Sequence, residues 1–368
     1  MPRTTPPYRA DQVGSFLRTA AIKDARARHE AGELDASELT RIEDHEIVEL
    51  IREQEKAGLQ LATDGEFRRS WWHFDFIGLL NGVEIVEIDH GIQFQGVQTK
   101  PKSPAIVGKI GFPPNHPFLD HFSFVAANTT VTPKMTIPSP TVLHWRAESS
   151  GIDPAVYPDR DAILDDLAAA YRAAVAAFYA AGCRYLQFDD TTWAYLCSQA
   201  EIEKAAARGV DIEGLSDKYV KLINDSIRDK PDDMVITTHV CRGNFKSTWI
   251  SSGGYEPVAE ALLAGCDYDG YFLEYDTERA GGFEPLRFLP EGEKIVVLGL
   301  ITSKNGDLEA AADVEARIKE ATEFVRLEQL ALSPQCGFAS TEEGNVLTET
   351  QQWAKMREIV DLAEEVWN

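Results

Sequence analysis

The chain has 368 residues, of which 44% are hydrophobic and 26% are charged. This composition is typical of a globular protein with an apolar core and excludes a disordered chain. The formal net charge of -24 opposes binding to nucleic acid and to anionic membranes. The first residues lack the pattern of a secretion signal, and no apolar run approaches the ~20 residues that span a bilayer. We therefore expect a cytoplasmic protein without nucleic-acid or membrane partners.

Eight apolar, β-rich runs alternate with helical patterns along the chain. They are QVGSF (12–16), LQLATDGEF (59–67), TVTPKMTIP (130–138), CRYLQFDD (183–190), DMVITTHVC (233–241), YDGYFLEYD (268–276), KIVVLGLIT (294–302) and LALSPQCGF (330–338). Eight strands that alternate with helices are typical of one α/β fold, the (β/α)8 or TIM barrel. We expect a single barrel domain over residues 1–368.

Four longer segments carry apolar residues at the three- and four-residue spacing of a helix. They predict helices at residues 36–58, 161–181, 309–330 and 349–366. Residues 78–128 break the alternation, because they contain VEIVEI, IQFQGVQT and PAIVGKI with turn signals but no long helical pattern. We expect a β-rich insertion after the second strand.

Polar side chains end several of the predicted strands, where barrel enzymes place their chemistry. His239 and Cys241 end the fifth run, Glu274 the sixth and Cys336 the eighth, and these runs are near neighbours around a barrel. Residues two apart on a strand point to one face, so His239 and Cys241 can converge. Two thiolates, an imidazole and a carboxylate suit Zn²⁺. The alternative interpretation is buried, unreactive cysteines beside a solvated carboxylate.

The remaining strand ends carry further polar residues. Gly14 and Ser15 end the first run, and the second and fourth runs end in acidic residues: Asp64, Glu66, Asp189 and Asp190. Two other cysteines, Cys183 and Cys266, precede apolar runs instead of following them. We expect these two thiols at the opposite end of the barrel.

Six motifs in this order carry a family resemblance: DQVGSF, DGEF, LQFDD, HVC, FLEYD and PQCG. Together they resemble the C-terminal, catalytic barrel of cobalamin-independent methionine synthase, and more closely the stand-alone single-barrel homologues of that enzyme. The resemblance spans nearly the whole chain. It implies a zinc ion that binds the sulfur of homocysteine as a thiolate, which attacks the N5 methyl group of 5-methyltetrahydrofolate.

The resemblance also implies roles for individual residues. The zinc ligands are His239, Cys241, Glu274 and Cys336. Gly14 and Ser15 would hold the carboxylate of homocysteine, and Glu66 and Asp189 its amine. Trp145 in TVLHWR would stack on the pterin, although a position in the core is the alternative for a lone tryptophan.

Two departures from the family pattern concern the methyl donor. The family's histidine at the seventh strand end is replaced by Thr302, Ser303 and Lys304, and an acidic residue that helps to hold the pterin by Tyr195. The N-terminal barrel of the full-length enzymes, which contributes to binding the polyglutamate tail, is also missing from the expected organisation. We therefore expect weak folate binding, and the small-molecule donor can be methyltetrahydrofolate, a methylcorrinoid or another small electrophile.

The same residues are also compatible with other functions. A thiol alkyltransferase could use another thiol or an epoxide, as in coenzyme M transferase; a sulfonate would then need basic residues, for which the candidates are Arg18, Arg68, Arg69 and Arg242. A zinc hydrolase is disfavoured, because two thiolates reduce the Lewis acidity of the metal. A purely structural zinc site is disfavoured because its ligands usually cluster locally. The sequence does not fix the oligomeric state.

Overall fold

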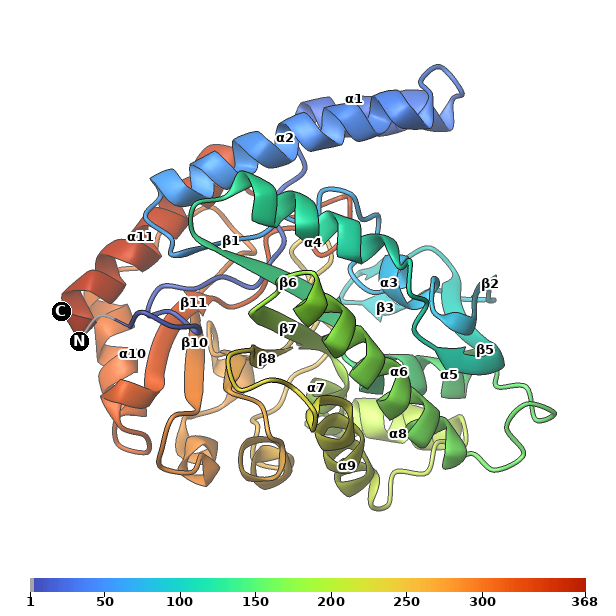
Figure 1. Cartoon of the computed structure of the whole chain (residues 1–368). Coiled ribbons are helices and arrows are strands. Elements are labelled where there is room, and N and C mark those ends of the chain that lie inside the picture. Colours follow the sequence, from blue (N-terminus) through green and yellow to red (C-terminus); the bar gives the residue numbers. More distant parts are fainter. Residues whose placement is uncertain (1–2) are drawn as a thin grey trace.

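Within residues 3–368, which this computed structural model describes apart from the side chain of Ser149, seven strands form a curled parallel sheet (Figure 1). In order of pairing they are β1 (Leu61–Ala62), β6 (Thr132–Pro138), β7 (Tyr185–Asp190), β8 (Val235–Val240), β9 (Gly270–Glu274), β10 (Ile295–Ile301) and β11 (Leu330–Pro334). The residues of β7, β9, β10 and β11 are buried throughout. Strands covered on both faces account for the continuous apolar runs in the sequence.

The first predicted strand, at residues 12–16, is not formed as a strand. Its neighbourhood makes only isolated bridges, from Ala10 to Leu332 of β11 and from Ser15 to Gly65 after β1. The Phe16 amide donates to the Gly65 carbonyl at 3.1 Å. The segment therefore lies between the two edge strands of the sheet. The second strand is also shorter than predicted, because Gly65 and Glu66 turn the chain with positive φ angles of 64° and 59°.

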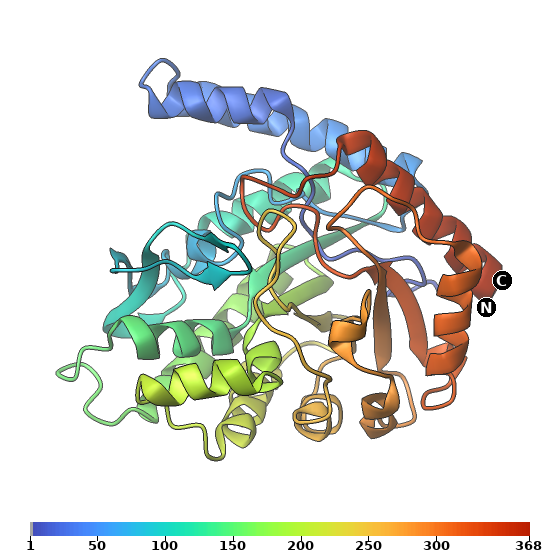
Figure 2. The same ribbon diagram turned by 180° about the vertical axis from the view of Figure 1, so that it is seen from behind.

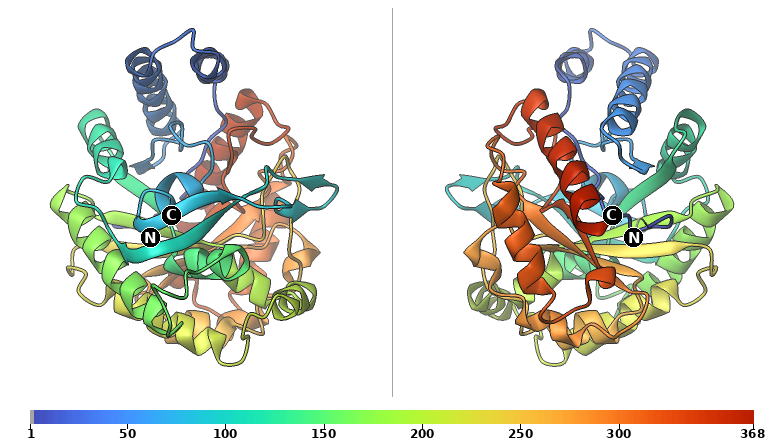
Figure 3. Two further views of the ribbon diagram at one scale, coloured as in Figure 1. Left: turned by 90° about the vertical axis from the view of Figure 1, so that its right-hand side faces the viewer. Right: turned by 90° about the vertical axis from the view of Figure 1, so that its left-hand side faces the viewer.

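The longer helices lie around the outside of the sheet, as the two side views show (Figure 3). They are α2 (Ala36–Lys56), α4 (Pro117–Asn128), α6 (Ala162–Ala180), α9 (Leu215–Ile227), α10 (Ala311–Ala321) and α11 (Glu349–Trp367). Helix α1 (Ala20–Glu30) packs along α2, and this pair extends beyond the rest of the molecule. No helix in residues 3–368 combines the length and the apolar character that crossing a membrane requires.

The helices at residues 36–58, 161–181 and 349–366 are confirmed to within two residues. Helix α11 begins with a capping box, in which the Thr348 side chain accepts from the Gln351 amide. The helix predicted at 309–330 is wrong in its second half, because α10 ends at Ala321 and a 3-10 turn (Leu327–Gln329) leads into β11. Several shorter helices are not predicted by the sequence patterns: α3 (Phe74–Ile77), α5 (Pro140–Ser150), α7 (Thr192–Leu196), α8 (Gln199–Ala207), a π-helical turn (Glu260–Gly265) and two 3-10 turns (Glu278–Ala280, Glu284–Phe288).

Residues 78–128 hold two antiparallel pairs and one helix. Strand β2 (Asn81–Glu87) pairs with β5 (Lys102–Gly111), and β3 (Gln93–Phe94) pairs with β4 (Val97–Gln98). The expectation of no long helix is wrong at the end of this region, since α4 covers 12 residues. Pro117 opens α4, and the His116 ring accepts from the Phe118 amide. The β-rich part is therefore limited to residues 81–111.

Candidate metal centre and active-site cleft

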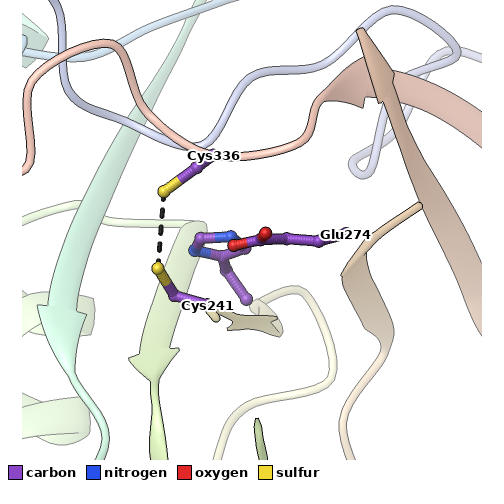
Figure 4. A group of neighbouring side chains, drawn as sticks. Cys241, Glu274 and Cys336 are labelled. Carbon is purple, nitrogen blue, oxygen red and sulfur yellow. Dashed lines mark hydrogen bonds between the residues drawn. The ribbon is translucent and has the colours of Figure 1, made fainter. Parts of the chain in front are cut away.

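The four predicted metal ligands come together at the carboxyl end of the sheet. His239 lies in β8, Cys241 directly follows β8, Glu274 ends β9, and Cys336 follows β11 by two residues. Their ligand atoms all lie within 4.8 Å of one another, and all four residues are buried. The sulfur atoms of Cys241 and Cys336 are 3.5 Å apart, and Glu274 points toward them (Figure 4).

A glycine in β10 lets Cys336 reach this cluster. Strand β10 lies between β9 and β11, so the chain after β11 must cross the end of β10. A Cβ atom at Gly299 would lie 2.6 Å from the Cα atom of Gln335, a distance at which the backbone would have to move. The Gln335 amide donates to the Ile301 carbonyl at 2.8 Å, which fixes the crossing. Close backbone approach therefore explains the glycine.

The side chains of the cluster are oriented by neighbouring polar groups. The Arg242 amide donates to Oε1 of Glu274 at 2.8 Å, whereas Oε2 is buried and has no partner within residues 3–368. The ring nitrogens of His239 lie 3.2 Å from the Gln335 carbonyl and 3.5 Å from Oδ1 of Asp189. A metal-binding histidine needs such an acceptor for its second nitrogen. The unpaired carboxylate oxygen and the N, O and S donors fit a Zn²⁺ ion.

The ionisable side chains of the cluster shift one another's pKa values. Burial lowers the pKa of His239, but the hydrogen bond to Asp189 and the charges of Cys336 and Glu274 outweigh it and raise the pKa to about 9. The hydrogen bond to Cys336, together with burial, raises the pKa of Cys241 well above its usual value. Burial acts to raise the pKa of Cys336, but its bond to Cys241 and the charge of His239 lower it. The two sulfur atoms lie 3.5 Å apart, within hydrogen-bond distance, and a cation bound by both would displace the proton between them.

Three residues predicted to bind an amino acid line the same cleft as the metal ligands. The wall of the cleft includes Ser15, Glu66 and Asp189 beside His239, Cys241 and Cys336. Gln187 donates to Oδ1 of Asp189 at 2.7 Å and so holds that carboxylate near His239. An acidic pair beside a metal cluster suits a ligand that carries both an ammonium group and a thiol.

Glu66 is held in a strained conformation. Its φ angle of 59° is rare for a residue with a side chain, and its amide donates to Oδ1 of Asp64 at 2.8 Å. Oε1 lies 3.2 Å from the Thr136 hydroxyl and 3.3 Å from Arg69, while Oε2 is buried with no partner in the described chain. Burial raises the pKa of Glu66 to about 7, although Arg69 opposes the shift. Strain and an unpaired oxygen at one residue are typical of a binding site.

Two predicted site residues do not reach the cleft. Gly14 is buried behind it, with a φ angle of 138°, and a Cβ atom there would lie 2.7 Å from Thr136. Trp145 is 4% exposed in the hydrophobic core, with its ring 5.6 Å from that of Tyr195. The core alternative is the one that the structure supports for Trp145. Its neighbours Arg146 and Tyr195 line the cleft instead.

The other basic and thiol candidates also lie away from the cleft wall. Arg18, Arg69 and Arg242 are buried and donate to backbone carbonyls, while Arg68 pairs with Glu43 and Asp44. Cys183 and Cys266 precede β7 and β9, at the strand ends opposite to the metal ligands. The four arginines therefore give no support to a sulfonate ligand.

The cleft also has an aromatic wall that the sequence patterns do not predict. This wall consists of Trp71, Trp72 and His73, from the segment before α3, and of Phe94 from β3. Phe94 packs 5.4 Å from Phe245 of the loop after β8, and the β3–β4 hairpin lies beside that loop (Figure 2). The run SWWHF was the available signal, but without the hairpin contact nothing placed it at the cleft.

Comparisons with known proteins agree with this arrangement. The family model described as cobalamin-independent synthase, catalytic domain, matches residues 9–365. The protein YxjH of Bacillus subtilis is 51% identical over 364 residues, which are 98% of this chain and 95% of that protein. The crystal structure of a proposed vitamin-B12 independent methionine synthase from Listeria monocytogenes has 46% identity and a TM-score of 0.80, with both chains covered completely.

A more distant structure shares the fold. The B12-independent methionine synthase from Shewanella sp. W3-18-1, solved in complex with selenomethionine, has a TM-score of 0.70 at 20% identity, with 96% of each chain covered. The family model covers nearly the whole chain, and the relatives in Bacillus and Listeria match over at least 95% of their length. The chain therefore belongs to the family of the cobalamin-independent synthase catalytic domain.

Proposed function

We propose that the protein is a zinc-dependent methyltransferase that moves a methyl group to a thiol, with homocysteine as the acceptor and methionine as the product. The observation that supports this most is the convergence of His239, Cys241, Glu274 and Cys336, with ligand atoms within 4.8 Å of one another, in a cleft that also contains Glu66 and Asp189. The test is whether the zinc-loaded protein forms methionine from homocysteine and a methyl donor.

The chain's own residues would bind and orient the acceptor. His239, Cys241, Glu274 and Cys336 would hold Zn²⁺, which lowers the pKa of an incoming thiol so that it reacts as a thiolate. Glu66 and Asp189 would bind the ammonium group through charge-assisted hydrogen bonds. Ser15, together with the backbone beside Gly14, would face the carboxylate. These contacts would place the sulfur toward the aromatic wall, where the donor's methyl group would lie in line with it.

The methyl donor would meet Arg146 and Tyr195 in the cleft. Arg146 donates to the Tyr195 hydroxyl at 2.8 Å, so the position occupied by an acidic residue in relatives has a basic partner here. We infer that free 5-methyltetrahydrofolate is a slow donor and that a methylcorrinoid or another small electrophile serves better. None of the four arginines considered above lines the cleft, so they do not favour coenzyme M as the acceptor; the arginine in the cleft wall is Arg146.

We also infer that residues 10–16 occupy the place of the first strand and close the sheet into a (β/α)8 barrel. The bridges of Ala10 to β11 and of Ser15 to Gly65 support this inference. The insertion within residues 78–128 then forms part of the cleft wall, because β3 contributes Phe94 to that wall. The whole chain would act as one catalytic domain.

We expect kcat/KM for homocysteine to depend on pH through the ionisation of Glu66. An ammonium group binds the carboxylate form, whose pKa is about 7, so kcat/KM for homocysteine should fall about tenfold per pH unit below about pH 7. Glu66→Gln should lower kcat/KM at pH 8 by about 10- to 150-fold, the effect of one lost charged hydrogen bond, and should remove the acid limb. Steady-state kinetics between pH 5.5 and 9 check both effects. An acid limb that persists in Glu66→Gln would show that another group titrates.

A further inference from the structure

His73 is a polar residue without a polar contact in the aromatic wall of the cleft. It is 1% exposed, and both ring nitrogens are buried with no hydrogen-bond partner in the part of the chain that the structure describes. The residue immediately precedes α3, but its side chain does not cap that helix. An unpaired buried polar group is unfavourable, and in a native protein it calls for an explanation.

The backbone around His73 is firmly held. The carboxylate of Asp75 accepts from the amides of Ser70 at 3.0 Å and Trp71 at 2.9 Å. The Trp72 amide donates to the Ser340 carbonyl at 3.0 Å, which fixes the segment to the loop that follows Cys336. The unpaired ring is therefore presented by an ordered segment that is hydrogen-bonded on both sides.

His116 is a useful comparison, because it is also 1% exposed and also packs among aromatic rings. One nitrogen of His116 lies 3.2 Å from the Phe76 carbonyl, and the other accepts from the Phe118 amide at 3.3 Å. Both nitrogens of His116 thus make hydrogen bonds that stabilise the start of α4. His73 lines the cleft, and within the described residues neither of its ring nitrogens makes a contact of this kind.

The surroundings determine the form of the His73 ring. Burial, with a further contribution from the charge of Arg146, lowers the pKa of His73 well below its usual value, so the ring is neutral at pH 7. The rings of Trp72 and Phe74 lie 4.5 and 4.1 Å away, centroid to centroid. A neutral imidazole offers one N–H donor and one acceptor nitrogen. Its natural complement is an uncharged polar group.

We propose that His73 determines which methyl donor the protein accepts, by a hydrogen bond to an uncharged polar group, such as a ring nitrogen, N–H or carbonyl, near the transferable methyl group. This assignment rests on the methyltransferase function proposed above. His73 orients the donor and transfers no proton. Sulfonium and quaternary ammonium donors are disfavoured, because Arg146 lines the same cleft and carries a positive charge that repels them.

Three variants test the assignment. His73→Phe removes both nitrogens and keeps a flat ring, His73→Asn restores a donor and an acceptor, and His116→Phe is the matched control for a buried structural histidine. The probes are 5-methyltetrahydrofolate and methylcobalamin, each titrated without any thiol by isothermal titration calorimetry. Zinc content and the thermal midpoint are measured for every variant.

His73→Phe should weaken binding of the probe that wild type prefers by about tenfold, the effect of a lost hydrogen bond, and His73→Asn should recover part of it. The thermal midpoint of His73→Phe should be unchanged or higher, because no paired group is lost. His116→Phe should lower the midpoint and leave donor affinity unchanged.

Three results would overturn the assignment: equal donor affinities of wild type and His73→Phe, a wild type that binds neither probe, or a loss of affinity that follows a lowered midpoint or zinc content. Because donor binding is measured without the thiol, these results are distinct from a failure of methyl transfer itself. Donor binding through His73 without methylation of homocysteine would contradict the proposed acceptor and leave the donor contact standing.

Discussion

Cys336→Ser is expected to reduce bound zinc from about one ion per chain to less than about a tenth of that amount and to abolish methyl transfer. A serine hydroxyl is a much poorer ligand than a thiolate, and the change would leave Cys241, His239 and Glu274 around an incomplete site. Losing a ligand should cost more than the roughly 10- to 100-fold in affinity that follows loss of a ligand's hydrogen-bond partner. Metal analysis of dialysed protein measures the effect, and Cys241→Ser should behave in the same way.

Cys183→Ser is the matched control for this experiment. Cys183 is also buried, but it precedes β7 at the other end of the sheet, and its thiol donates to the Tyr185 carbonyl at 3.3 Å. A serine hydroxyl can make that bond, so zinc content and activity should remain at the wild-type level. Full zinc content in both Cys241→Ser and Cys336→Ser would contradict the assignment of the metal ligands.

Asp189→Asn is expected to weaken both zinc binding and the binding of homocysteine. The carboxylate lies 3.5 Å from Nδ1 of His239, and loss of such a partner lowers metal affinity by about 10- to 100-fold. The same carboxylate is proposed to bind the substrate ammonium, so kcat/KM for homocysteine should fall by a further factor of about 10 to 150 when zinc is saturating. Zinc titration against a chelator and steady-state kinetics at saturating zinc separate the two effects.

The neighbouring Asp190 provides the control. It ends β7 and is fully buried, but its carboxylate accepts from the Thr141 hydroxyl and the Thr192 amide, both at 2.6 Å. Asp190→Asn should therefore lower the thermal midpoint while zinc affinity and the KM for homocysteine stay near wild type. If Asp189→Asn retained wild-type zinc affinity and KM, neither role assigned to Asp189 would stand.

The metal cluster could be predicted from the sequence because local rules determine it. His239 and Cys241 end an apolar run, and the residues after parallel strands meet at one end of the sheet. Glu274 and Cys336 follow the same rule on β9 and after β11. Periodicity alone does not reveal which strand-end residues form one ligand set. The family resemblance supplied that grouping.

The parts that sequence patterns did not predict depend on contacts between distant segments. Residues 12–16 have a strand's composition, but the chain there makes only isolated bridges, from Ser15 to Gly65 after the short β1 and from the preceding Ala10 to Leu332 in β11. The family resemblance predicts Trp145 at the pterin, but Trp145 is 4% exposed in the core, and its ring neighbour Tyr195 lines the cleft instead. The aromatic wall needs the β3–β4 hairpin, whose Gln95 amide donates to the Trp249 carbonyl at 3.1 Å, about 150 residues along the chain.

The most direct test of the account is transfer of a labelled methyl group to homocysteine. Zinc-loaded protein is incubated with homocysteine and either trideuteriomethyl-cobalamin or 5-trideuteriomethyl-tetrahydrofolate, and the products are identified by mass spectrometry. Parallel reactions contain 2-mercaptoethanesulfonate instead of homocysteine, or Cys336→Ser instead of the wild type. The account predicts labelled methionine from homocysteine, faster with the corrinoid donor, and none from Cys336→Ser. Absence of labelled methionine with both donors, or its formation at an equal rate by Cys336→Ser, would contradict zinc-dependent methyl transfer to homocysteine.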